Sequence, residues 1–151
     1  MATTLDPESN SLAVLVKHVG GNLTSRFTDF LTSDGEKPNR DRDSEFVVSS
    51  SAHREAIVAQ WNAGWQRLTA TLGELRGDEL RATVRIRGQE MSALAAINRA
   101  LAHIANHVGQ IVYLAKHLRS TDWQTLSIPR GRSADFVPAQ SPTPPSRPAG
   151  P

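Results

Sequence analysis

The sequence has no cysteine, no long apolar run and no concentrated charge of one sign. Without cysteine, disulfides, thiolate metal sites and cysteine nucleophiles are excluded, so any metal site must use histidine, carboxylates or water. A nucleic-acid-binding surface needs a basic cluster on one face, but the formal net charge is only +2. The arginines alternate with acids, as in Asp41-Arg42-Asp43. We therefore expect no binding to nucleic acid.

Membrane and secretory signals are also missing. No apolar run approaches the roughly 18 residues of a membrane span. The first residues, Met-Ala-Thr-Thr-Leu-Asp, lack the charged and apolar regions of a signal peptide. At 151 residues with 38% hydrophobic side chains, the chain is long enough for one domain with its own core. We expect a cytoplasmic protein that does not contact the membrane.

Apolar residues repeat with helical spacing in three segments. The first begins near residue 12 after Ser11 as a cap, although Gly20-Gly21 weakens the expectation of a regular helix there. The second spans about residues 52–75 with Gly77 as its expected C-terminal cap, and the third spans about 93–118 after Ser92. Residues 83–88 alternate like a short extended segment. These patterns predict an all-α bundle over residues 1–136, followed by a disordered proline-rich tail over 137–151.

His103 and His107 are the candidates for metal ligands. Residues four apart lie on one face of a helix, roughly 5–6 Å apart between Cβ atoms, so both rings can reach one ion. Both fall at the border of the apolar stripe, where a partly open site is expected. A zinc protease needs a glutamate beside the first histidine, but Ile104 stands there. This spacing also occurs by chance in surface histidines that bind nothing.

His18 is the third candidate ligand, on the edge of the first predicted helix. If that helix packs beside the third, His18 reaches the pair. Three histidines leave one position of a tetrahedral ion open, as in catalytic rather than structural sites. Ligating histidines usually donate their second N–H to a partner, and Asn22 and Gln110 are placed to accept it. His53 and His117 are interpreted as surface residues.

Three segments of the sequence resemble one branch of the DinB-like superfamily, which consists largely of uncharacterised bacterial proteins. The first begins with the pattern His18-x-x-Gly21-Asn22-x-x-Ser25-Arg26 and runs to residue 46. The others cover residues 103–116 and 123–131. The resemblance implies a four-helix bundle that binds a divalent metal, zinc or nickel, through His18, His103 and His107. Better-understood members of the superfamily are thiol-dependent S-transferases and isomerases that use bacillithiol or mycothiol, so a low-molecular-weight thiol is the implied second cofactor.

The resemblance also suggests a departure from the family pattern. Members have a complete helix before the segment that matches residues 7–11, and only about ten residues stand there. Either the true start of the chain lies upstream, or we expect a four-helix bundle that lacks most of its first helix, with its apolar face covered in a homodimer. A non-catalytic helical dimerisation or stress-response module with a vestigial site is the alternative to a metal-dependent transferase or hydrolase that acts on a small molecule.

The polar segment between the first two predicted helices carries candidate substrate-binding residues. Arg26, Arg40 and Arg42 could hold a carboxylate of the thiol or of its substrate through bidentate contacts. The same segment also fits a solvated, charge-balanced connector without a function. Spacing alone does not separate these two interpretations.

Overall fold

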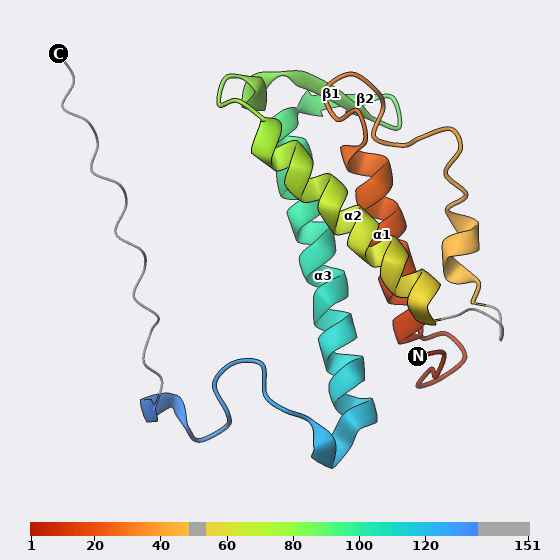
Figure 1. The fold of residues 1–151 in the computed structure, drawn as a ribbon, viewed down its shortest axis with the longest axis vertical. Coiled ribbons are helices and arrows are strands. Elements are labelled where there is room, and N and C mark those ends of the chain that lie inside the picture. The colour runs from red at the N-terminus through yellow and green to blue at the C-terminus, as the bar shows by residue number, and fades with distance from the viewer. Residues whose placement is uncertain (49–53, 136–151) are drawn as a thin grey trace. The chain divides into compact units, whose positions relative to one another are not determined.

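The computed structural model describes residues 1–48 and 54–135. They form two compact units, of which the first is Met1–Leu118 and the second begins at Arg119. The elements of the first unit are α1 (Leu12–Phe27), η1 (Asp43–Phe46), α2 (Arg54–Glu74), η2 (Glu79–Arg81), β1 (Thr83–Ile86), β2 (Gln89–Ser92) and α3 (Ala93–Arg119, which ends at the boundary) (Figure 1). The second contains η3 (Ser120–Asp122) and η4 (Ser133–Asp135).

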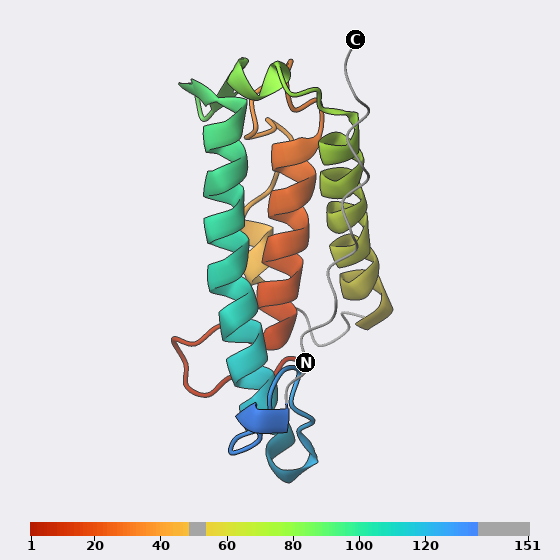
Figure 2. The same ribbon diagram turned by 90° about the vertical axis from the view of Figure 1, so that its left-hand side faces the viewer.

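The prediction of a mostly helical fold is confirmed, but the prediction of a four-helix bundle is not. The described residues contain three α-helices and a two-stranded antiparallel sheet. Figure 2 shows α1 between α2 and α3. None of the helices within residues 1–48 and 54–135 combines the length and the apolar character that a membrane crossing requires. The predicted tail, His53 and the domain boundary at residue 136 lie outside the described residues.

The ends of α1 and α3 follow from their capping residues. The Ser11 hydroxyl accepts a hydrogen bond from the Val14 amide at 3.3 Å, and the Ser92 hydroxyl accepts one from the Ala95 amide at 3.2 Å. Both satisfy an amide that has no partner within its helix. The predicted cap at Gly77 is wrong, because α2 ends at Glu74 and Gly77 does not adopt a positive φ. Leu72, in the last turn of α2, is exposed.

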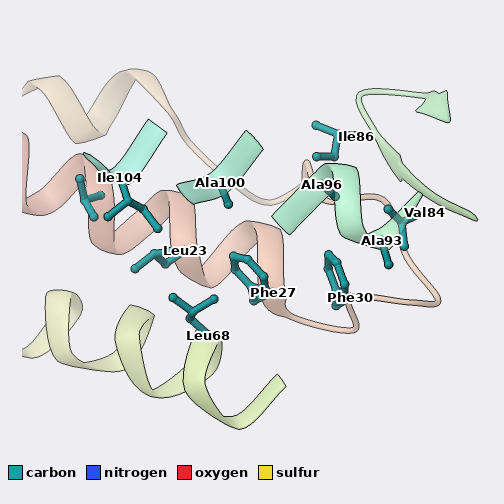
Figure 3. Close-up of a cluster of buried hydrophobic side chains, with 11 residues drawn as sticks. Leu23, Phe27, Phe30, Leu68, Val84, Ile86, Ala93, Ala96, Ala100 and Ile104 are labelled. Atoms are coloured by element: carbon teal, nitrogen blue, oxygen red, sulfur yellow. The ribbon is translucent and has the colours of Figure 1, made fainter. Parts of the chain in front are cut away.

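The buried core joins all three helices and the hairpin. Figure 3 shows Leu23 and Phe27 of α1 between Leu68 of α2 and Ile104 of α3. Val84 and Ile86 of β1 close one end of this cluster against Ala93 and Ala96. The alternation predicted for residues 83–88 is therefore real: Val84 and Ile86 are buried, whereas Thr83 and Arg85 are exposed.

The glycine pair does not interrupt α1, which is continuous through Gly20 and Gly21. A Cβ atom on Gly20 would lie 2.8 Å from the Gln60 carbonyl oxygen, and one on Gly64 would lie 2.6 Å from the Gly20 carbonyl oxygen. Both positions require glycine because the α1 and α2 backbones approach each other closely. The cost of glycine in a helix, about 1 kcal/mol each, is offset by this packing, which the sequence does not reveal.

The connector between α1 and α2 turns back and runs along α1. Arg26 Nη1 and Ser25 Oγ donate to the Gly35 carbonyl at 2.6 and 2.8 Å, and Lys17 Nζ donates to the Ser44 carbonyl at 2.6 Å. The connector therefore passes from the C-terminal end of α1 to its N-terminal half, where η1 lies beside α1 (Figure 1). This course brings residues 40–46 next to His18.

Candidate metal centre

The structure brings His18, His103 and His107 together. Each offers one ring nitrogen, and these three atoms lie within 4.8 Å of one another. His18 comes from α1 and is 4% exposed, whereas His103 and His107 come from α3 and are partly buried. The prediction that α1 and α3 converge at these side chains is confirmed.

The spacing of one pair of ring nitrogens matches that of two ligands on a single small cation. Nε2 of His18 lies 3.3 Å from Nε2 of His103. Two nitrogens bound to one zinc ion at about 2.05 Å with a tetrahedral angle are roughly 3.3 Å apart. Nδ1 of His103 is buried and has no hydrogen-bond partner. The case for a metal here rests on three imidazole donors and on this spacing.

Glu45 orients His18, and the sequence analysis missed it. Its Oε2 lies 2.8 Å from Nδ1 of His18, and Glu45 is 3% exposed. A carboxylate at this position accepts the Nδ1 proton, which leaves the lone pair of Nε2 free and directed at His103. This is the carboxylate–histidine arrangement that usually supports metal-bound imidazole.

Glu45 belongs to a chain of alternating charges behind the histidines. Arg40 binds it through two hydrogen bonds, Nε to Oε1 at 2.8 Å and Nη2 to Oε2 at 2.9 Å. Arg40 also contacts Glu36 at 3.3 Å, and Arg26 donates to Glu36 at 2.9 Å. Burial raises the pKa of Glu45, but the hydrogen bonds from His18 and Arg40 outweigh it and hold the pKa below its usual value. Glu45 is therefore a carboxylate at neutral pH.

The two histidines of α3 are neutral near pH 7. Burial, followed by the neighbouring His107 and His18, lowers the pKa of His103 to about 4. Burial also lowers the pKa of His107, against a hydrogen bond to Gln110 that raises it. Neutral imidazole is the form that binds a metal. His103 and His107 are thus in the form that can accept a cation at physiological pH.

Gly21 makes room for the Glu45 carboxylate. A Cβ atom at residue 21 would lie 2.3 Å from Oε1 of Glu45. Lys17 fixes the same stretch of connector by donating to the carbonyls of Ser44 and Val47. The ring of Phe46 lies 5.0 Å from the ring of His18. An aromatic residue in an otherwise polar segment was the one sequence signal that this part of the connector is packed.

Gln110 and Asn22 differ in how they meet the histidines. Oε1 of Gln110 lies 3.0 Å from Nδ1 of His107, where it can accept the proton of that nitrogen. Asn22 is buried and lines the pocket beside the site. Within the described residues no hydrogen bond joins Asn22 to a histidine, because Glu45 holds Nδ1 of His18.

The three predicted arginines all line this pocket, together with Arg87 and Arg99, which the sequence analysis missed. Arg87 follows β1 and Arg99 lies on α3. Nothing in their local sequence distinguishes them from the other arginines of the chain. Their role becomes visible only when the hairpin packs beside α1 and α3.

Comparison with known proteins places the chain in a family but gives it no activity. No curated protein and no solved structure matches it. A family model described as a protein of unknown function, DUF1572, matches residues 1–132. The match covers both helices that carry the histidines and the connector that carries Glu45. The chain therefore belongs to the DUF1572 family of proteins of unknown function.

Proposed function

We propose that this protein binds one divalent metal ion through His18, His103 and His107 and is a metal-dependent enzyme of the DinB-like superfamily. The observation that carries the proposal is the convergence of three ring nitrogens, one of them oriented by a buried carboxylate. The pattern of residues 18–46 and 103–116, which resembles that superfamily, supports the same assignment. Zinc or nickel suits a set of imidazole ligands.

The proposed reaction is thiol-dependent S-transfer to a small electrophile. A metal held by three histidines keeps a position for a thiol or a water, whose pKa it lowers when bound. The residues of the chain hold the site in place: Glu45 keeps the proton of His18 on Nδ1, and Gln110 can do the same for His107. The pocket beside His18 and His103 gives a substrate access to the site.

Metal binding is tested on protein purified without a histidine tag. We expect about one equivalent of zinc or nickel by elemental analysis, and a rise of the thermal midpoint when metal is returned to chelator-treated protein. His103→Gln should abolish both effects. His117→Gln, a change on the exposed part of the same helix, should leave both intact. If no metal copurifies and neither ion shifts the midpoint, the proposal is wrong.

The reaction is tested on metal-loaded protein with bacillithiol, mycothiol or glutathione and a fluorogenic electrophile. Conjugation that requires both the metal and Glu45 supports S-transfer. Hydrolysis of the electrophile without thiol consumption supports water as the nucleophile instead.

A non-catalytic interaction module is the second candidate, and exposed apolar residues on α3 favour it. Leu94, Leu101 and Tyr113 are 49%, 63% and 71% exposed. Such residues are a feature of surfaces that bind a partner, and a homodimer is the partner that we propose. Light scattering should show a dimer. A monomer with metal-dependent turnover would contradict this candidate.

A further inference from the structure

A pocket of about 320 Å³ lies beside the histidines, and its charged wall is entirely basic. Among the residues that the structure describes, no aspartate or glutamate lines it, whereas five arginines do: Arg26, Arg40, Arg42, Arg87 and Arg99. The volume is at the small end of ligand pockets, which span roughly 300–1,000 Å³. Ile86, Ala96 and Ala100 belong to the buried core and give the pocket an apolar floor (Figure 3).

Two of these arginines, Arg26 and Arg40, each make more than one side-chain hydrogen bond inside the protein. Arg40 donates hydrogen bonds to Glu45 and Glu36, and its side chain is 6% exposed. Arg26 donates to the Gly35 carbonyl and to Glu36. These side chains support the connector and Glu45. Arg26 and Arg40 line the pocket but already donate to the connector, so we assign them a supporting role, and their contact with a substrate stays a prediction.

The other three arginines keep free donors at the pocket. Arg42 lies with its guanidinium 4.9 Å from the ring centre of Phe46, which supports its face and leaves its edges free. Its nearest acid, Asp43, is 3.9 Å away and 98% exposed. Arg99 makes no ion pair within the described residues, and it stands one helical turn before His103, on the same face of α3.

Arg87 occupies a backbone position that disfavours it. It is the first residue of the two-residue turn between β1 and β2, and its φ is 55°. Turns of this kind prefer asparagine, aspartate or glycine there, because a bulky residue at positive φ is strained. Asp34 holds the turn by accepting the amides of Arg87 and Gly88 at 2.8 and 2.7 Å. Arg87 binds Glu36 through Nε alone, at 3.0 Å, so both terminal nitrogens remain available.

We infer that this pocket binds the carboxylate or phosphate group of a small anionic molecule through Arg42, Arg87 and Arg99. Arg42 directly precedes η1, Arg87 lies in the hairpin turn and Arg99 lies on α3. The site therefore forms only in the folded protein. Planar guanidinium groups bind such oxyanions in a bidentate manner. The position of Arg99 one turn before His103 places the opposite end of the molecule at the histidines. The identification of this molecule as the substrate rests on the proposed function.

The experiment measures binding of two probes by calorimetry at constant ionic strength. Sulfate represents the tetrahedral oxyanion and succinate the carboxylate, and each is titrated with and without a chelator. We expect saturable binding of at least one probe in both conditions. Arg99→Gln and Arg87→Gln should each weaken it about tenfold, the loss of one charge-assisted contact. Arg67→Gln, the same charge change on the exposed face of α2, should leave it unchanged.

The outcomes separate this inference from the metal proposal. Binding that persists in chelator and depends on Arg87 and Arg99 supports the pocket even if no metal binds. Binding that requires metal and ignores both substitutions makes the anion a metal ligand only, and overturns the inference. Absence of binding for both probes, or equal weakening by Arg67→Gln, also overturns it. Preference for sulfate over succinate assigns the group to phosphate, and the reverse preference assigns it to a carboxylate.

Discussion

The two sides of α1 make different kinds of contact with the rest of the protein. Toward α2 the helix backbone itself makes the contact, since Gly20 and Gly64 have no side chains and Leu23 packs directly beside them. Toward the connector the same helix presents polar groups: His18 meets Glu45, and Arg26 meets Glu36. Gly20 and Gly21 are neighbours in sequence, yet the first serves the close helix crossing and the second accommodates a carboxylate.

This difference separates the close packing of α1 against α2 from the polar contacts that hold the proposed metal site. Close packing against α2 has no tolerance for an added methyl group, but it does not touch the histidines. The ionic side tolerates small shifts, but each shift changes how His18 is oriented. Substitutions on the two sides should therefore have different signatures, and four of them test the comparison.

The largest effect is expected from Glu45→Gln. It leaves Arg40 with a buried charge that has lost one partner, which costs about 3 kcal/mol of unfolding free energy. It also replaces the carboxylate that orients His18 with a neutral amide, so metal affinity should fall about 10- to 100-fold. Urea denaturation and metal titration measure the two losses.

The matched control is Glu90→Gln, which breaks the ion pair with Arg85. That pair has a similar distance, 2.6 Å, but both side chains are more than half exposed. The loss there should be below about 1 kcal/mol. Similar losses in the two variants would show that the buried ionic side of α1 is not special.

Gly64→Ala should be the next most destabilising. The new methyl group meets the Gly20 carbonyl oxygen at 2.6 Å and its Cα at 3.0 Å, and backbone atoms cannot move aside cheaply. Overpacking of this kind costs about 1–3 kcal/mol. Metal affinity of the remaining folded protein should not change. Gly73→Ala on the same helix, with open space around it, should instead be neutral or stabilise the protein by up to about 1 kcal/mol.

Gly21→Ala should affect metal binding more than stability. The methyl group displaces the end of the Glu45 side chain, which lies 2.3 Å from its expected position. We expect about tenfold weaker metal binding with little net loss of stability, because alanine also favours the helix. Gly20→Ala should show the opposite pattern in the same two assays. If both variants lose only stability, Glu45 does not act through His18.

The effect that is smallest near neutral pH is a pH dependence of the metal-free protein. The pKa of His103 is about 4 in the folded state, below its ordinary value of 6.5, so the unfolded chain binds the proton more readily. Stability should be independent of this group above pH 6.5 and decrease as the pH falls from about 6.5 to 4. Urea midpoints in chelator measure it. His103→Gln should flatten the curve, and an unchanged slope would contradict the assignment.

The helices and the histidine cluster could be predicted because their signals are local. Ser11 and Ser92 mark helix starts, and His103 and His107 share a face through their spacing alone. His18 joined them by the family resemblance, which supplied the long-range contact that periodicity lacks.

Glu45, the two glycine contacts and β2 could not be predicted, for three physical reasons. A carboxylate in a polar segment has the same sequence pattern whether it is solvated or buried against a histidine. Helix propensity counts Gly20 as a cost, while its benefit depends on the distance to α2. β2 (Gln89–Ser92) has little apolar alternation and forms because the turn at Arg87-Gly88 pairs it with β1.

The connector between α1 and α2 holds Glu45 behind the histidines and Arg42 at the pocket. Under the two proposals, a substitution in residues 36–46 would alter metal retention and ligand choice together. Arg99 stands on α3, apart from this chain of ion pairs. A change of ligand specificity through the connector would also change metal retention, whereas a change at Arg99 would not. Position 99 would therefore tolerate such a change better than the connector.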